Sequence, residues 1–470
     1  MSRQSAIDYV LDLEMHGIKL GLEKIRLLLE ALGRPENRYP CVLVGGTNGK
    51  GSVTAMIIEA LARAGYHCGR YTSPHLVRFD ERICLNERPI SLSALETHAR
   101  RARRAIDQLL ASGDFKEPCT FFEATTAMAL DYFARAHVDA AVLEVGMGGR
   151  FDATNAAEPI LSVITNIDLD HERYLGNTRS LIAREKIGIT RRNRPLVSGP
   201  THARSLAAIR AGCRRAGAVL VEAAREVKAR VVPDPRRRLA RPHASGNHVR
   251  IFPGVTGGGM GEWVRFRSPR RAYGPLRLAL AGRHQIDNAR TVIAALERLE
   301  DEGFTLPREA IEAGLSGVRW PGRLEHLPGR PLLILDGAHN PAGARALASY
   351  LASRNFEDLT LVFGAMQDKS IQRMARHLFP VARRVILTRV PHPRAADPRT
   401  LSVSLASLNG WLTVMDDPAR ALDVALALTT SSGGAVCVCG SIYLVGAALE
   451  HSEVRERQRT GQRPSAASAV

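Results

Sequence analysis

The sequence predicts an α/β protein with a parallel-sheet domain that carries a small added β region, followed by a smaller Rossmann-like α/β domain. Three observations support this expectation. At 470 residues the chain is too long for one ordinary core, so two or three domains are expected. Strand-like and helix-like runs alternate over 41–190 and again after 331, which is typical of parallel sheets covered by helices. Between these blocks, residues 225–280 are rich in Pro, Gly and Arg.

In the first block, apolar residues at helical spacing predict a helix over 25–32, which Gly33 and Pro35 end. Short continuous apolar runs then indicate strands, and longer periodic runs indicate helices. In chain order, these runs predict a strand at 41–44, helices at 53–61 and 122–136, strands at 138–145 and 160–165, and a helix at 178–190.

The composition changes at 225–280, where short β-type runs predict small antiparallel additions and 253–261 predicts a loop or hairpin tip. A helix is predicted over 285–299. The second block is expected to contain strands at 332–335, 359–363, 385–387, 412–414 and 435–439. We therefore expect domains at 1–316 and 317–450, and a disordered polar tail at 451–470.

Composition excludes several classes of protein. An apolar content of 45% with interspersed charge is typical of a globular chain, and no stretch approaches the roughly 18 apolar residues of a membrane helix. The N-terminal segment carries charges among its apolar residues and lacks a signal-peptide core, so we expect a cytoplasmic protein with no membrane partner. Seven scattered cysteines predict reduced, mostly buried thiols.

The net charge of +18 comes mostly from arginine. We rank a solvated, arginine-rich surface first as its explanation, and attraction of anionic substrates second. Nucleic-acid binding ranks third, because no aromatic residues interleave with the basic ones to form a stacking platform. We expect no nucleic-acid partner.

The most informative segment is the glycine-rich turn at 44–52 (VGGTNGKGS), here named the phosphate loop. A strand that ends in glycines and restarts as a helix forms a nest of backbone N–H groups at a positive helix end, which holds phosphates. Lys50 can reach terminal phosphates, and the Ser52 hydroxyl can bind Mg²⁺. Because the spacing departs from the common pattern at Gly51, a turn that binds nothing is the alternative. The predicted nucleotide-binding residues here are Gly46, Thr47, Asn48, Gly49, Lys50, Gly51 and Ser52.

The spelling GTNGKGS resembles the ATP-binding loop of the Mur ligase superfamily, most closely its folate branch, the dihydrofolate synthases and folylpolyglutamate synthases. Other segments resemble that branch in the same order over most of the chain. They are TSPHL at 72–76, EVGMGGRFDATN at 144–155, TNIDLDH at 165–171, GRHQIDNA at 282–289, WPGRLE at 320–325 and LDGAHNP at 335–341. The resemblance implies a P-loop ATPase domain followed by a ligase domain.

The resemblance also implies two Mg²⁺ ions, with Ser52, Ser73, Glu144, His171 and Lys186 as ligands. Glu144 has independent support, because a carboxylate inside an apolar strand is costly unless it is paired or binds metal. Each ligand has an alternative role. Glu144 could instead be bonded to an arginine or a backbone amide, and Ser73 could belong to an ordinary structural turn. His171 could be a hydrogen-bonded loop residue, since Mg²⁺ prefers oxygen ligands. Lys186 matches a lysine that is carbamylated in many relatives, and burial makes a lysine able to add CO₂.

For the nucleotide base, the resemblance implies contacts from Gln285 and Asn288, with helix capping as the alternative for Gln285. Arg323 would reach the ATP phosphates from the second domain. Asp336 and His339 follow a strand and would help close the cleft, with Asp336 also near the nucleotide and His339 a candidate base for an incoming amine. The predicted catalytic residues are Lys50, Lys186, Asp336 and His339.

The pteroate pocket is expected at Thr120, Phe122, Arg150, Asp152 and Ala153, which match bifunctional relatives. Phe122 would supply a stacking surface, and Asp152 would accept hydrogen bonds from the pterin. The alternative is that Asp152 only caps the turn before residue 154.

The resemblance therefore implies an ATP-dependent amide ligase that adds L-glutamate to dihydropteroate, forming dihydrofolate, and to reduced folates, forming polyglutamates, through an acyl phosphate. A monofunctional dihydrofolate synthase or folylpolyglutamate synthase is the first alternative. A P-loop kinase or NTPase of another class, including a nucleic-acid-stimulated ATPase, is the second. The expected partners are small molecules, and the expected state is a monomer.

Overall fold

The computed structural model describes residues 5–17, 19, 21–235, 261–408, 410–430 and 433–462. The chain forms two compact units. The first comprises Met1–Lys228, Arg267–Arg271 and Asp287–Val318, and the second comprises Ala229–Phe266, Ala272–Ile286 and Arg319–Val470. The predicted domain limits stay predictions, and the predicted loop at 253–261 lies, except for its last residue, outside the described residues.

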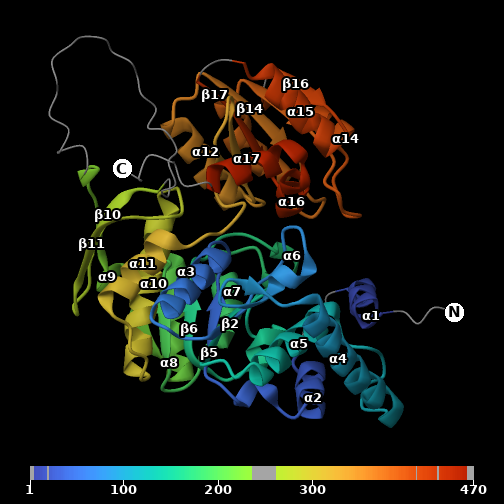
Figure 1. The fold of residues 1–470 in the computed structure, drawn as a ribbon, viewed down its shortest axis with the longest axis vertical. Coiled ribbons are helices and arrows are strands. Elements are labelled where there is room, and N and C mark those ends of the chain that lie inside the picture. Colours follow the sequence, from blue (N-terminus) through green and yellow to red (C-terminus); the bar gives the residue numbers. More distant parts are fainter. Residues whose placement is uncertain are drawn as a thin grey trace. The chain divides into compact units, whose positions relative to one another are not determined.

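The first unit is built on an eight-stranded sheet with the order β4-β3-β2-β5-β1-β6-β7-β8. The strands from β2 to β8 in this order run parallel, and β3 and β4 extend the sheet as antiparallel neighbours. Figure 1 labels β2, β5 and β6 of this sheet. The strands are β1 (Cys41–Gly45), β2 (Cys68–Tyr71), β3 (Ile83–Leu85), β4 (Arg88–Pro89), β5 (Ala140–Glu144), β6 (Pro159–Ile164), β7 (Pro195–Ser198) and β8 (Val219–Glu222).

Helices connect and cover these strands. They are α1 (Ala6–Asp12), α2 (Glu23–Ala31), α3 (Lys50–Arg63), α4 (Leu92–Ser112), α5 (Phe121–Arg135), α6 (Glu172–Leu175), α7 (Arg179–Lys186), α8 (Ala203–Ala216), α9 (Ala223–Glu226), α10 (His284–Asp301) and α11 (Arg308–Gly317). Short 3₁₀ turns of the first unit are η1 (Leu13–His16), η2 (Pro35–Asn37), η3 (Phe79–Arg82), η4 (Ala153–Ala156) and η5 (Ile187–Ile189), and those of the second unit are η7 (Phe379–Val381) and η8 (Ala406–Leu408).

Successive side chains of a strand point to opposite faces of the sheet, and helices cover both faces of this sheet. Cys41 and Leu43 of β1 join a core formed with α1, α2, α4 and α5. On the other face α3 packs on β1, β2 and β5, and α11 packs on α3. The close approach of α11 depends on Gly314, where an added Cβ would lie 2.7 Å from the Cα and Cβ of Ala60. The helix that follows the phosphate loop is therefore buried between the sheet and a second helix.

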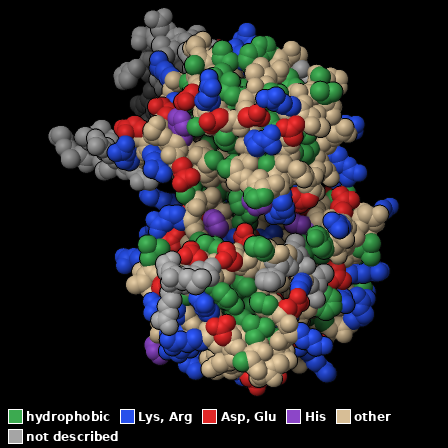
Figure 2. Space-filling model, turned by 90° about the vertical axis from the view of Figure 1, so that its right-hand side faces the viewer, with side chains coloured by type: hydrophobic (Ala, Val, Ile, Leu, Met, Phe, Trp, Pro, Cys, Tyr) green, Lys and Arg blue, Asp and Glu red, His purple; other side chains and the backbone are tan. Residues whose placement is uncertain are grey.

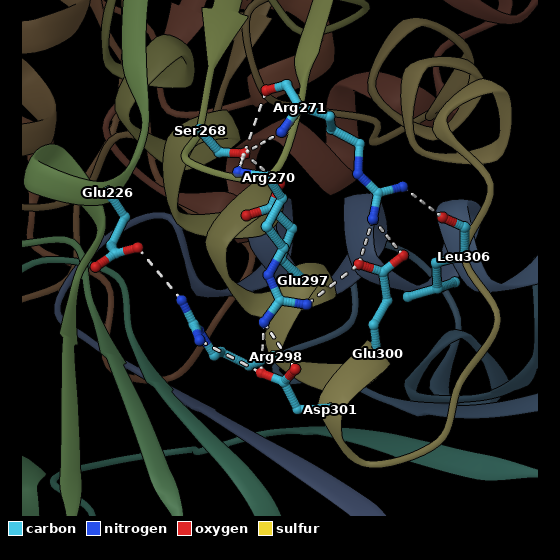
Figure 3. Close-up of polar contacts among 9 residues, drawn as sticks. All are labelled: Glu226, Ser268, Arg270, Arg271, Glu297, Arg298, Glu300, Asp301 and Leu306. Carbon is cyan, nitrogen blue, oxygen red and sulfur yellow. Dashed lines mark hydrogen bonds and ion pairs between the residues drawn. The ribbon is translucent and has the colours of Figure 1, made fainter.

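A three-stranded sheet with the order β11-β10-β9 occupies part of the predicted β region. Its strands are β9 (Lys228–Val231), β10 (Trp263–Arg267) and β11 (Ala272–Arg277). The turn between β10 and β11 is bonded to the C-terminal half of α10 (Figure 3). Arg271 pairs with Glu300 and donates to the Leu306 carbonyl oxygen at 3.2 Å, and the Ser268 hydroxyl donates to the buried Glu297 carboxylate at 2.6 Å. Arg270, Asp301, Arg298 and Glu226 complete this cluster. These bonds fix α10 at the end opposite to its N-terminus.

The second unit contains a six-stranded sheet with the order β12-β13-β17-β14-β15-β16, in which all neighbours except β12 run parallel. The strands are β12 (Glu325–Leu327), β13 (Leu332–Asp336), β14 (Asp358–Phe363), β15 (Arg384–Leu387), β16 (Leu412–Val414) and β17 (Gly434–Cys439). The helices are α12 (Pro341–Ser353), α13 (Ile371–Leu378), α14 (Pro398–Leu405), α15 (Pro418–Leu428), α16 (Ile442–Glu450) and α17 (Ser452–Gln462). The five strands predicted for this block are confirmed.

The predicted disorder after residue 450 is wrong for residues 452–462, which form α17. The buried Arg457 donates to the Pro331 carbonyl oxygen at 2.7 Å, and Gln458 donates to Glu325 at 3.2 Å. Tertiary bonds of this kind stabilise a polar helix that lacks an amphipathic sequence signal. Residues 463–470 lie outside the described residues.

The surface carries basic and acidic side chains together. Figure 2 shows Lys and Arg side chains interspersed with Asp and Glu over the visible face. Several arginines pair with carboxylates, as Arg210 does with Glu222 and Arg191 with Glu158. All seven cysteines are buried free thiols, as predicted. Among the described residues, no helix combines the length and apolarity needed to cross a bilayer.

Replacing Gly314 with alanine should destabilise the first unit, because the added Cβ would overlap Ala60. Overpacking of this kind costs about 1–3 kcal/mol. Gly317→Ala in the same helix is the matched control, since the nearest atoms there are side-chain ends of Arg63 and Glu59 at 3.4 and 3.6 Å. Thermal unfolding followed by circular dichroism should give a lowered midpoint for Gly314→Ala and an unchanged or slightly raised one for Gly317→Ala. Equal midpoints would contradict the packing argument.

Candidate functional site

The candidate site lies where four neighbouring parallel strands of the first unit end. The Cα of Tyr71 in β2 pairs with Leu143 in β5, that of Val44 in β1 with Glu144, and Gly45 pairs with Ile164 in β6. The segments that leave these strands carry most of the predicted residues. Open α/β sheets place their ligand sites at this carboxyl edge.

The phosphate loop has the backbone of a phosphate-binding turn. Gly46 has φ of 145° and Gly49 has φ of 80°, which favour glycine. An added Cβ at Gly46 would lie 1.9 Å from the Thr165 hydroxyl oxygen, and one at Gly49 would lie 2.7 Å from Oδ1 of Asn288. Both glycines are therefore required by conformation and by contact. The loop leads directly into α3, whose N-terminus provides the positive end of a helix dipole.

Lys50 is the first residue of α3, and its Nζ donates to the Thr47 carbonyl oxygen at 3.3 Å. Ser52 lies in the same first turn and is 2% exposed. The N–H groups of Thr47 and Asn48 donate to Asn166 at 3.0 and 2.6 Å. These two residues of the predicted nucleotide set are thus engaged in shaping the loop.

Lys186, the last residue of α7, is buried against the phosphate loop. Its Nζ donates to the Gly46 carbonyl oxygen at 2.8 Å. Burial, reinforced by the charge of Lys50, lowers the pKa of Lys186 to about 7, while Asp170 and Asp152 oppose this shift. A lysine with this pKa is partly neutral at neutral pH, as a nucleophilic or carbamylated amine requires.

Two of the predicted metal ligands, Ser73 and Glu144, lie at the ends of the adjacent strands β2 and β5. The Ser73 N–H donates to Oε2 of Glu144 at 3.3 Å, and Glu144 is 6% exposed. His171 has φ of 50° and precedes α6, and its own N–H donates to Asp170 at 2.9 Å. Left-handed backbone at a non-glycine residue is costly and is concentrated at functional sites. Within the described ranges, no three or more His, Cys, Asp and Glu side chains gather as a metal cluster.

The donor set fits Mg²⁺ on one condition. A Ser hydroxyl and a Glu carboxylate are suitable oxygen donors, but the charge of a protonated Lys186 amine repels a cation. Conversion of Lys186 to a carbamate replaces that charge with an anionic oxygen ligand. The residues therefore fit the metal when this lysine is carbamylated.

Two of the predicted pteroate residues lie at the start of α5. Phe122 is half-buried in α5, and its ring would contact a Cβ added at Gly146 at 2.6 Å. Thr120 is the N-cap of α5. Its backbone N–H and hydroxyl both donate to Glu123 in a capping box, so in this structure its bonds are those of the helix start. Ala153 is buried in the core.

Asp152 binds the turn that contains it. Its Oδ1 accepts from the Thr154 N–H at 3.1 Å and hydroxyl at 2.6 Å, and its Oδ2 accepts from the Met147 N–H at 2.8 Å. Burial raises its pKa, and these hydrogen bonds oppose the rise. This geometry is the turn cap considered as an alternative, so the pterin contact stays a prediction. Arg150, in the same loop, is half exposed, with its guanidinium 3.9 Å from Glu185.

Asn288 of α10 lies beside Gly49 of the phosphate loop in the first unit. Its contact with the nucleotide stays a prediction. The remaining predicted residues belong to the second unit. Gln285 is 2% exposed in the first turn of α10, and its Nε2 lies 3.2 Å from Nε2 of His284. Burial and nearby Arg323 lower the pKa of His284 to about 4, so this imidazole is neutral.

Asp336 anchors the segment that carries Arg323. Its carboxylate accepts from the N–H of Leu324 and of Ala338, each at 2.9 Å. Burial raises the pKa of Asp336, opposed by Arg323 and by these backbone bonds. The His339 Nδ1 donates to the Gly337 carbonyl oxygen at 2.8 Å. Asp336 is thus placed to position Arg323, whereas its predicted contact with nucleotide stays a prediction.

Sequence reasoning missed the contacts of Thr165, Asn166 and Asp168 with the phosphate loop. A usable signal was present, because these polar residues directly follow a predicted strand, and carboxyl ends of parallel neighbours meet at one edge. That signal was incomplete without the strand order, which places β6 beside β1.

Two protein-family models match the chain: the Mur ligase middle domain over 44–196 and the Mur ligase glutamate ligase domain over 322–442. The chain is 34% identical over 448 residues to a dihydrofolate synthase/folylpolyglutamate synthase of Bacillus subtilis, covering 94% of this chain and 95% of that protein. It is 35% identical over 481 residues to a bifunctional folylpolyglutamate synthase/dihydropteroate synthase of Haloferax volcanii, covering 100% of this chain but 54% of that protein. The chain thus spans about half the length of this second relative.

Among solved structures, Escherichia coli FolC in complex with DHPP and ADP matches with a TM-score of 0.81 and 29% sequence identity. The match covers 97% of this chain and 99% of that one. The predicted fold class is confirmed by this likeness together with the eight-stranded and six-stranded sheets described above.

The buried position of Lys186 predicts a pH-dependent stability. Its pKa is about 7 in the folded protein against 10.5 ordinarily, so between these values the unfolded chain holds a proton that the folded chain lacks. The free energy of unfolding should therefore fall as pH falls from about 10 to about 7, and this term should change no further below pH 7.

Lys186→Met removes this pH-dependent contribution to the free energy of unfolding. Its melting temperature minus that of wild type should therefore increase as pH falls from about 10 to about 7. Differential scanning calorimetry without ligands is the measurement. Lys228→Met, on the surface, is the control. A difference between Lys186→Met and wild type that is independent of pH would show that the lysine is not desolvated.

Proposed function

The chain belongs to the dihydrofolate synthase/folylpolyglutamate synthase family of ATP-dependent ligases, and on this premise we propose that it adds L-glutamate to dihydropteroate and to reduced folates. One observation supports the proposal most strongly. The phosphate loop has two left-handed glycines at the start of α3, and the buried Glu144 lies at the end of the neighbouring strand. This is the arrangement that a phosphoryl-transfer site requires.

We assign the nucleotide to the phosphate loop. Lys50 and the backbone N–H groups of the first turn of α3 would neutralise the phosphates, and Asn288 would contact the nucleotide. We propose that the site binds two divalent cations, with Ser52, Ser73, Glu144, His171 and a carbamylated Lys186 as ligands. A bound Mg²⁺ would supply charge neutralisation for the phosphates. In the second unit we propose Arg323 as a phosphate contact, positioned by Asp336.

The reaction balances without a protein nucleophile. A carboxylate oxygen of the pterin substrate attacks the γ-phosphorus of ATP, the bond to the β,γ-bridging oxygen breaks, and ADP leaves. The amine nitrogen of glutamate then attacks the acyl carbon, the bond from that carbon to the phosphate oxygen breaks, and the amine loses a proton as phosphate leaves. Positioning and charge neutralisation supply most of the catalysis in such transfers. We propose His339 as the acceptor of the amine proton.

We propose that Phe122 and the 146–153 loop contact the pterin. Phe122 is half-buried and adjoins Gly146, which gives a stacking surface beside the loop that carries Arg150 and Asp152. The alternatives within the family are a monofunctional dihydrofolate synthase and a monofunctional folylpolyglutamate synthase. A monomer acting on small molecules remains the proposed state.

Purified enzyme with ATP, Mg²⁺ and glutamate should form dihydrofolate from dihydropteroate and should extend tetrahydrofolate, with products resolved by mass spectrometry. ADP release should depend on glutamate, which a kinase or a simple NTPase would not require.

Lys50→Ala should lower turnover by about 100-fold or more, because it removes a cation from the transferring phosphoryl group, with little change in melting temperature.

Each negative outcome of this experiment has its own meaning. Failure with dihydropteroate alone would leave a folylpolyglutamate synthase, and failure with tetrahydrofolate alone would leave a dihydrofolate synthase.

Asp152→Ala should harm the dihydropteroate reaction more than the tetrahydrofolate reaction. Equal losses would assign Asp152 to the turn alone.

The carbamate should be detectable at Lys186. The neutral amine nitrogen attacks CO₂, a nitrogen–carbon bond forms, and a proton is released. Nuclear magnetic resonance with ¹³C-labelled bicarbonate at pH 8 should show a carbamate signal that Lys186→Ala lacks. Lys186→Ala should be inactive and partly restored by acetate, whereas Lys50→Ala, the control, should not respond to acetate. A wild-type spectrum without the signal would contradict the assignment.

A further inference from the structure

We propose that Thr165 and Asn166 are positioning residues that hold the phosphate loop in its binding conformation before nucleotide arrives. The inference rests on the nucleotide site of the proposed function and adds to it. Both residues follow β6 directly, next to the strand that leads into the loop. Neither would need to contact the nucleotide to act.

The peptide groups of Asn48 are bonded on two sides by these residues. The Asn48 N–H donates to Oδ1 of Asn166 at 2.6 Å, and the Thr165 hydroxyl donates to the Asn48 carbonyl oxygen at 2.6 Å. The residues that bond here are more than 100 positions apart in the chain. The middle of the loop is therefore fixed by a neighbouring strand end rather than by its own sequence.

Thr47 is bonded in the same way. Its N–H donates to the Asn166 carbonyl oxygen at 3.0 Å, and its hydroxyl donates to the Asp168 carbonyl oxygen at 3.0 Å. The Asp168 N–H donates in turn to the Thr47 hydroxyl oxygen at 3.0 Å. Two consecutive loop residues thus make five hydrogen bonds to residues 165–168, counting the two at Asn48.

The helix α7 extends this support. At its start, Arg179 donates to Oδ1 of Asp168 at 2.7 Å, and at its end Lys186 donates to the Gly46 carbonyl oxygen at 2.8 Å. The segment 165–168 is therefore anchored to the same helix that contacts the loop. This arrangement makes the strand-end segment and α7 a single support for Gly46, Thr47 and Asn48.

Such support matters because the loop contains glycines. Gly46 and Gly49 give the backbone freedom, and a loop that is mobile before binding loses that freedom when phosphates order it, which weakens affinity. Bonds from Thr165 and Asn166 restrict the loop in advance. Their loss should weaken nucleotide binding, even though all groups that contact the phosphates are retained.

The test compares Thr165→Ala with Thr165→Ser in the full-length protein, with ADP binding measured by isothermal titration calorimetry. Both variants lack the threonine methyl group, and only the serine keeps the hydroxyl donor. We expect the Kd for ADP to rise about tenfold in Thr165→Ala, as for loss of one hydrogen bond, and to stay within about threefold of wild type in Thr165→Ser. Ser162→Ala is the control, because its buried hydroxyl lies in β6, just before Thr165, and donates to the Ile189 carbonyl oxygen at 2.7 Å.

Ser162→Ala should lower the melting temperature without changing the Kd, which separates lost stability from lost positioning. Equal affinities for Thr165→Ala and Thr165→Ser, or wild-type affinity in Thr165→Ala, would overturn the proposal. If Thr165→Ala does not fold, Asn166→Ala replaces it, and wild-type affinity in that folded variant would overturn the proposal too. A wild-type protein that binds ADP but does not ligate glutamate would count against the proposed function and leave this inference intact.

Discussion

The contact between Gly46 and the Thr165 hydroxyl constrains the phosphate loop, and much of the site depends on it. Gly46 has φ of 145°, and a Cβ at this position would lie 1.9 Å from that hydroxyl oxygen. The loop can therefore approach the end of β6 only through glycine. Because this approach is so close, the residues after β6 can bond the loop backbone directly. The second left-handed glycine, Gly49, similarly admits Asn288 from α10.

Burial gives Lys186 both its structural and its proposed chemical role. Its buried position brings its Nζ within hydrogen-bond distance of the phosphate loop, and the resulting desolvation lowers its pKa to about 7. A lysine in water would be charged and unreactive toward CO₂ at neutral pH. Placing this amine beside Lys50 further disfavours its charged form. Two lysines thus lie close together in the candidate site, and burial favours the neutral form of one of them.

Two buried aspartates among the predicted site residues accept hydrogen bonds mainly from backbone N–H groups. Asp152 accepts from N–H groups of its own turn, and Asp336 accepts from the N–H groups of Leu324 and Ala338. Carboxylates that accept such bonds define the shape of loops that carry other side chains. Position in a motif therefore does not distinguish a carboxylate that contacts substrate from one that orients the loop around it.

The sequence by itself determined the local features of this protein. Apolar runs predicted β1, β5 and β6 and the five parallel strands of the second unit, but not β2. The glycines with Lys50 and Ser52 predicted the phosphate loop. These signals depend only on neighbours in the chain. The sequence did not predict the helix α17, whose polar residues are stabilised by hydrogen bonds such as that from Arg457 to the Pro331 carbonyl oxygen.

Only the tertiary structure decided which segments meet. Strand order placed β6 beside β1, and so brought Thr165 and Asn166 to Asn48. The fold also buries Lys186. Burial, together with the charge of Lys50, lowers the pKa of this lysine. Neither result is visible locally, because hydrogen bonding across strand ends and desolvation depend on distances that the fold sets rather than on sequence spacing.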